Sequence, residues 1–141
     1  MRIHDQAADD ISIETPDNWP DINVSGIQKD FSIDEKVAPE KLEELLTLAV
    51  DQVVKHFDPL LVELPLLGAY EIYFRQAVYQ LAYSLLIPSL PVSSQHKSEP
   101  EEAMTLEKRM MFFERMSLQY QQKIPGFINR FSKPSISSEL L

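Results

Sequence analysis

The chain has 141 residues, which is enough for one domain with a modest core and too few for two. Hydrophobic residues make up 44% of it, so its composition excludes a wholly disordered protein. It contains no cysteine, which excludes disulfides and thiolate metal sites. Its net charge of −9 argues against binding to nucleic acid, because affinity for phosphates depends on cations.

Glycine is scarce, with three residues, while ten prolines mostly follow the ends of apolar runs. This pattern favours helices with proline stops over a turn-rich sheet, and we predict an all-α fold, a small bundle of about four helices. We expect three parts: an extended N-terminal arm over 1–20, a helical domain over 21–131 and a C-terminal docking tail over 132–141.

Residues 1–20 predict an extended arm. Ile11 and Ile13 alternate with polar residues, and two prolines oppose helix formation. The N-terminal sequence MRIHDQAADD lacks the apolar core of a signal peptide, so we expect no secretion by that route. Trp19, the only tryptophan, lies at the end of the arm. We expect it to pack over the edge of the domain as an anchor, and we include it among the candidate protein-interaction residues.

A short helix is predicted from Ser25 to Phe31. Ser25 is a favourable N-cap, and Gln28 three residues later completes a capping box. Ile27 and Phe31, which are four residues apart, are expected to face inward. The charged stretch over 33–40 is then expected to be a loop.

Residues 39–57 predict a longer amphipathic helix. Pro39 suits its first turn, and the glutamates that follow interact favourably with the positive end of the helix dipole. Pro59 ends it, and the leucine-rich loop after Pro59 is expected to pack on the core or against a neighbouring subunit. The apolar stripe comprises Leu42, Leu45, Leu46, Ala49, Val53 and Phe57.

The stretch from Tyr70 to Ile87 predicts a central helix that is apolar on most of its circumference. Such a helix has to be enclosed by other helices or by neighbouring subunits. It carries two charges, Glu71 and Arg75, which are four residues apart and are expected to pair on one side. Polar residues in its first turns argue against a membrane span, which needs roughly twenty predominantly apolar residues.

A last long helix is predicted from about residue 100 to Lys123, after a polar loop over 91–100. Its apolar residues spread over more than one face, and four of the five methionines of the chain lie here. Methionine adapts to irregular neighbours. Core packing is the first interpretation of these methionines and a subunit interface is the second, for which Met110 and Met111 are the candidate residues.

The C-terminal residues form a polar tail after Pro125 and Gly126 end the last helix. Residues 123–141 carry three cations and one anion, whereas residues 1–50 carry four Lys/Arg against twelve Asp/Glu. This asymmetry favours attraction between the tail of one molecule and the acidic front of another; two solvated ends of unlike composition are the alternative. Alternating residues near the end suit a strand added to a partner, and a frayed terminus is the default alternative. The candidate docking residues are Phe131, Ser135, Ile136, Ser137, Glu139, Leu140 and Leu141.

No catalytic or metal-binding motif is apparent in the sequence. The three histidines are isolated, and His56 is expected to interact with the last carbonyls of its helix. Adjacent carboxylates such as Glu43 and Glu44 diverge on a helix and do not face one substrate. We therefore expect no enzymatic activity, no cofactor and no metal.

The order of these elements resembles the head completion proteins of tailed bacteriophages with contractile tails. The likeness covers residues 17–141 through NWPDINVSGIQKDFSIDEKVAPEKLEELLTLAVDQVVKHF, then YFRQAVYQLAYSLL, then FSKPSISSELL. The methionine-rich last helix is not part of the pattern. The matching positions are Trp19, Ser25, Ile27, Val37, Leu42, Ala49, Val53, Tyr73, Arg75, Ala77, Val78, Tyr79, Ser137, Glu139, Leu140 and Leu141.

The resemblance implies a structural virion protein, a head–tail adaptor that forms a ring under the portal after DNA packaging and provides the tail attachment surface. Implied partners are further copies of the chain, in a ring for which the family suggests twelve subunits, the portal protein, and a tail terminator or other neck protein. Genomic DNA would pass through the channel without specific binding, and no membrane is involved. The implied location is the virion neck, after assembly in the host cytoplasm.

Two other function classes remain open. A helical regulatory or inhibitory module would bind one host or phage partner through the methionine-rich helix, in a one-to-one complex. A small hydrolase would use the acidic clusters. Changing Glu43, Glu44, Glu101 and Glu102 to Gln would then abolish activity and leave assembly intact.

Overall fold

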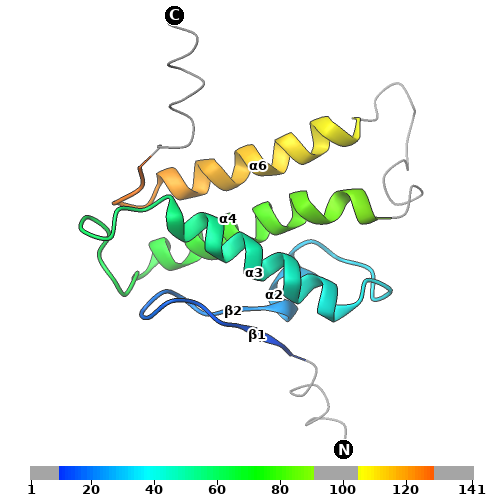
Figure 1. Ribbon diagram of the computed structural model, residues 1–141, viewed down its shortest axis with the longest axis horizontal. Coiled ribbons are helices and arrows are strands. Elements are labelled where there is room, and N and C mark those ends of the chain that lie inside the picture. The colour runs from blue at the N-terminus through cyan, green and yellow to red at the C-terminus, as the bar shows by residue number, and fades with distance from the viewer. Residues whose placement is uncertain (1–9, 91–104, 129–141) are drawn as a thin grey trace, which may run out of the picture.

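Four α-helices and one short hairpin make up the part of the chain that the computed structural model describes, residues 10–90 and 105–128 (Figure 1). This architecture confirms the predicted small helical bundle, to which the two-stranded hairpin is a minor addition. The elements in chain order are β1 (Ser12–Ile13), β2 (Ile22–Asn23), α2 (Val24–Asp30), α3 (Pro39–Lys55), α4 (Ala69–Leu86), the 3₁₀ turn η1 (Ile87–Ser89) and α6 (Leu106–Gln122).

The helix α4 is the centre of the bundle, as its apolar circumference predicted. It contacts both α3 and α6, and α6 runs antiparallel beside it (Figure 1). Ile72 is exposed, so the enclosure covers most of the helix and not all of it. Within the described residues, no helix combines the length and hydropathy required to cross a membrane. The buried side chains of α4 are Phe74, Ala77, Val78, Tyr79, Leu81, Ala82, Ser84 and Leu86.

The amphipathic helix α3 forms where the sequence predicted it. Pro39 occupies the first turn and Glu40 lies near the positive end of the helix dipole. The helix ends at Lys55, with His56 as the C-cap, and Phe57 is buried just beyond this end. The buried face consists of Leu42, Leu45, Leu46, Ala49, Val50 and Val53, which extends the predicted stripe by one valine.

The N-terminal hairpin lies against the helical core. β1 and β2 pair antiparallel, with Ile13 opposite Ile22, and both isoleucines are buried. Ile13 and Trp19 therefore share the core of the helical domain, and the hairpin crosses the boundary that the sequence suggested at residue 20. Residues 1–9 of the expected arm lie outside the described residues.

Trp19 is buried in the loop of this hairpin, with 8% of its surface exposed. Its ring centroid lies 5.6 Å from that of Phe57 and 5.0 Å from that of Phe74 in α4. The indole thus anchors the hairpin to the end of α3 and to α4, which confirms the anchor interpretation. Its inclusion among the protein-interaction residues stays a prediction, for which the enclosed side chain offers little area to a partner.

The start of α2 differs from the prediction. The helix begins at Val24 with Asn23 as the N-cap, and Asn23 makes no side-chain capping bond. Ser25 lies inside the first turn, where its N–H donates to Oδ1 of Asp10 at 3.3 Å, so the expected capping box with Gln28 does not form. The pairing of β2 with β1 accounts for the shift, since Asn23 is still in the strand and the chain turns directly into the helix.

Gly26 lets α2 lie directly on Tyr79 of α4, because a Cβ atom at position 26 would overlap the Tyr79 hydroxyl. Burial raises the pKa of Tyr79, and the carboxylates of Asp30 and Asp10 raise it further, whereas Arg75 lowers it. The hydroxyl is therefore neutral at physiological pH, as close packing against a helix requires.

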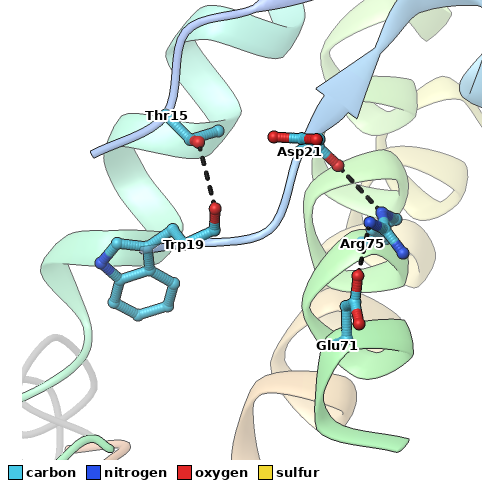
Figure 2. A network of polar contacts seen from close by, with 5 residues as sticks. All are labelled: Thr15, Trp19, Asp21, Glu71 and Arg75. Atoms are coloured by element: carbon cyan, nitrogen blue, oxygen red, sulfur yellow. Dashed lines mark hydrogen bonds and ion pairs between the residues drawn. The ribbon is translucent and has the colours of Figure 1, made fainter. Parts of the chain in front are cut away.

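Arg75 fastens the hairpin to α4 from the outside (Figure 2). Its Nε donates to the carbonyl oxygen of Asp21 at 2.9 Å, and its guanidinium lies 2.7 Å from the Glu71 carboxylate. On the hairpin side, the Thr15 hydroxyl donates to the carbonyl of Trp19 at 3.4 Å. The predicted pair between Glu71 and Arg75 is confirmed, and the bond to Asp21 gives it a tertiary role.

We expect Arg75→Ala to lower the free energy of unfolding by about 1 kcal/mol, because the variant loses a bond between two elements as well as an ion pair. Urea denaturation followed by circular dichroism measures this loss. The matched control is Lys55→Ala, which removes the exposed i,i+4 pair with Asp51 at 3.0 Å on α3 and should cost under about 0.5 kcal/mol. Equal losses in the two variants would show that the bond to Asp21 contributes nothing.

A chain of buried polar groups joins α3, α4 and α6. The Ser117 hydroxyl donates to the carbonyl of Ala77 at 2.7 Å, and Nε2 of Gln121 donates to Ser117 at 3.0 Å. Oε1 of Gln121 lies 2.6 Å from Nδ1 of His56, which is therefore the donor. Ser117 and Gln121 are both buried, so these bonds fix the position of α6 against its neighbours.

Candidate interaction surface

The N-terminal half of α6 presents apolar side chains to solvent. Met111 is 52% exposed and Phe112 is 43% exposed, and Leu106 is similarly open. Phe113, which follows Phe112, points inward. Its ring centroid lies 4.9 Å from that of Tyr83 and 6.1 Å from that of Phe31. We call Leu106, Met111 and Phe112 the α6 patch.

Cations border the α6 patch. Lys108 precedes Phe112 by four residues and Arg115 follows it by three, so both lie beside Phe112, whereas Glu107 and Glu114 lie at the same offsets beside Met111. Lys108 and Arg115 are exposed, and neither forms an ion pair with another described residue. Their charges are available to an acidic surface on a partner.

None of the methionines described in α6 is buried, so core packing, the first interpretation, is wrong for them. Met110 and Met116 are partly buried and Met111 is exposed. The side chains of α6 that are fully buried are the polar Ser117 and Gln121. An interface role for Met110 and Met111 stays a prediction.

A second apolar surface lies in the loop between α3 and α4. Asp58 closes the first turn of this loop. Its Oδ1 accepts a hydrogen bond from the N–H of Leu60 at 2.9 Å. Its carbonyl oxygen accepts from the N–H groups of Leu61 and Val62, each at 2.9 Å. This turn leaves Leu60 90% exposed and Leu61 more than half exposed. Leu67, farther along the loop, is 72% exposed. The predicted packing of these leucines on the core is wrong for Leu60, Leu61 and Leu67, and a neighbouring subunit remains as the other expectation.

The same loop forms a small hollow with the segment after α6. It has a volume of about 150 Å³ and is mostly apolar, and Glu63 is the charged residue in its lining. Leu64 and Pro65 are joined by a cis peptide bond on this stretch. We call it the loop hollow; its lining residues are Glu63, Pro65, Leu66, Leu67, Tyr70 and Pro125.

The segment after α6 is pinned to the end of α3, beside the loop hollow. The N–H of Asp58 donates to the carbonyl of Gly126 at 2.9 Å, and the N–H of Ile128 donates to the carbonyl of His56 at 2.8 Å. Gly126 has φ of 101°, and a Cβ atom there would lie 2.7 Å from Cα of Val62, so only glycine fits without strain. This attachment holds residues 126–128 at the loop end of the molecule.

The tail residues of the predicted site lie outside the described residues. These are Phe131, Ser135, Ile136, Ser137, Glu139, Leu140 and Leu141. Met110 and Met111 belong to the first half of α6, which begins at the end of the bundle opposite the α3–α4 loop (Figure 1). Residues 126–128 are bonded to the end of α3, and Trp19 is buried in the core.

The leucine loop and its hollow are the part of the surface that the sequence did not single out as a site. Its leucines were visible in the sequence, but the hollow combines residues 63–70 with Pro125, which are far apart along the chain. Within residues 10–90 and 105–128, no group of three or more His, Cys, Asp or Glu side chains is placed to hold a metal ion.

Comparisons of the chain with protein-family models, with curated proteins and with solved structures found no match. Its function is therefore inferred from its own surface and sequence.

Proposed function

We propose that the chain is a structural virion protein, a head completion protein of a contractile-tailed phage that forms a ring under the portal after DNA packaging and presents the tail attachment surface. The observation that carries this proposal is the pair of unlike apolar surfaces, the α6 patch and the loop hollow. The first belongs to the start of α6 and the second to the α3–α4 loop, which lie at opposite ends of the bundle (Figure 1). A ring subunit needs two different surfaces, because each copy contacts the next through a head-to-tail interface.

The segment that precedes the tail and the net charge of the chain support the same role. The segment up to Ile128 is fixed at the loop end by its bonds to Asp58 and His56, and the polar tail over 132–141 follows it in the sequence as the proposed docking segment. The net charge of −9 suits a ring around DNA, since like charge suppresses adhesion to phosphates. This role includes no catalytic step and places the chain at the virion neck.

A helical regulatory module is the second candidate, and the exposed α6 patch is the observation that favours it. Such a module would bind one partner through α6 and form a one-to-one complex. Electron microscopy of the purified chain, with and without the portal protein of the same phage genome, separates the two candidates. Rings bound to the portal support the adaptor role, and single copies bound to one partner support the module.

Deleting residues 132–141 is expected to abolish co-sedimentation with the portal protein while the helical fold is retained. The described core ends at Ile128, so no described contact is lost in the truncated chain. Far-UV circular dichroism checks the fold, and sedimentation with portal assemblies checks binding. Undiminished binding by the truncated chain would exclude the tail as the docking segment.

A further inference from the structure

We propose that the α6 patch of one copy of the chain docks on the loop hollow of the next copy, with Phe112 as the inserted side chain and Met111 next to it on α6. This inference names the contact between subunits of the ring proposed above and rests on that function for its setting.

The two surfaces are too far apart to meet within one molecule. Pro125, which lines the hollow, lies just beyond the C-terminal end of α6, whereas the α6 patch belongs to the first half of the helix. At roughly 1.5 Å per residue, Met111 lies roughly 16 Å from that end. Figure 1 shows the α3–α4 loop and the start of α6 at opposite ends of the bundle. A contact between them therefore joins two copies.

The size and chemistry of the hollow suit one such side chain. A dry apolar cavity of about 150 Å³ is large enough to bind benzene, and the loop hollow has about 150 Å³. Two prolines, two leucines and the Tyr70 ring supply apolar walls. A phenyl ring or a methionine side chain fills such a space. Because the two prolines restrict the backbone of the walls before binding, insertion costs little conformational entropy.

The charges of the two surfaces are complementary around Phe112. Glu63 lines the loop hollow and forms no ion pair with another described residue. Lys108 lies four residues before Phe112 on α6 and Arg115 three residues after it, whereas Glu107 and Glu114 hold the same offsets from Met111. Insertion of Phe112 into the hollow brings a cation of one copy close to Glu63 of the next, and this fixes the direction of docking.

A contact of this kind is heterologous, so repeated copies form a ring or a filament and not a closed pair. It involves few side chains, and interfaces well below about 1,000 Å² are weak. We therefore expect the free chain to associate weakly, and the portal to gather copies at a density at which the contact forms.

Disulfide trapping tests the contact, because the chain has no cysteine of its own. Leu67→Cys and Met111→Cys chains, carrying tags of different mass, are mixed and oxidised. We expect the mixed 67–111 dimer to exceed both like-with-like dimers several-fold, and a chain carrying both substitutions to give a ladder of higher oligomers. The matched control replaces Leu67→Cys by Leu48→Cys, an exposed leucine on α3, and should give only background dimer.

A charge exchange provides the second readout. Glu63→Lys on the Leu67→Cys chain should reduce the mixed dimer, and Lys108→Glu with Arg115→Glu on the Met111→Cys chain should restore it. A mixed dimer no more abundant than that of the Leu48 control overturns the inference. A mixed dimer that forms only after residues 132–141 are removed also overturns it, since the hollow is then occupied by the chain's own tail.

The outcomes separate this contact from the adaptor role. Rings on the portal without 67–111 trapping overturn the contact and leave the adaptor role standing. A 67–111 ladder from a chain that never binds the portal supports the contact and removes the adaptor role.

Discussion

Replacing Trp19 by alanine is expected to lower the free energy of unfolding by about 3–5 kcal/mol, the range for removing a large buried aromatic side chain. The indole fills the space between Phe57 and Phe74 and holds the hairpin on the helices, so its loss leaves a cavity and frees the chain around it. A domain of this size is stable by about 5–15 kcal/mol, so the change removes a large share of the total. Urea denaturation followed by far-UV circular dichroism measures it.

Two variants make this result interpretable. Trp19→Phe keeps an aromatic ring in the same space and should recover more than half of the loss. Leu60→Ala removes an apolar side chain that is 90% exposed and should change stability by less than about 0.5 kcal/mol. If Trp19→Ala is as mild as Leu60→Ala but abolishes self-association, Trp19 belongs to an interface and its assignment to the core is wrong.

The longer helices were predictable because their signals are local. Pro39 and Pro59 bracket α3, and its leucines recur at the spacing of one helical face. The helix α4 was predictable from its apolar circumference, and the ion pair between Glu71 and Arg75 was predictable from their i,i+4 spacing. These patterns need no knowledge of the tertiary fold.

The hairpin and the start of α2 were not predictable in the same way. β1 and β2 have two residues each, too short for an alternating pattern to define their pairing. Once Ile13 pairs with Ile22, the chain enters α2 at Val24, and the capping preference of Ser25 is overridden. Tertiary packing decides such termini, because a cap contributes only about 1 kcal/mol.

The surface of α6 shows a different limit of sequence reasoning. Apolar residues on several faces did not reveal which face meets α4, and hydropathy assigns Ser117 and Gln121 to solvent. They are buried because they bond to each other, to Ala77 and to His56, and His56 lies 65 residues from Gln121 along the chain. Met111 and Phe112 are exposed because these polar residues occupy the inner face.

The second large effect is expected from Gln121→Leu, which should lower the free energy of unfolding by about 2–3 kcal/mol. Leucine keeps much of the volume of glutamine, so the loss reports mainly on hydrogen bonds. The Nδ1–H group of His56 loses its acceptor, and the buried Ser117 hydroxyl loses its donor. Gln122→Leu is the matched control, because Gln122 is exposed on the same turn and should cost less than about 0.5 kcal/mol.

Combining Gln121→Leu with Ser117→Ala tests whether these bonds act as one unit. Ser117→Ala alone leaves the buried Nε2 of Gln121 without its acceptor, which costs about 1–3 kcal/mol. In the double variant no amide is left unpaired, so its loss should fall short of the sum of the single losses by about 1 kcal/mol. Strict additivity in urea denaturation would mean that the two bonds stabilise the protein independently. Coupling would instead show that α6, and with it the α6 patch, is held in place by one polar network that reaches from Ala77 to His56.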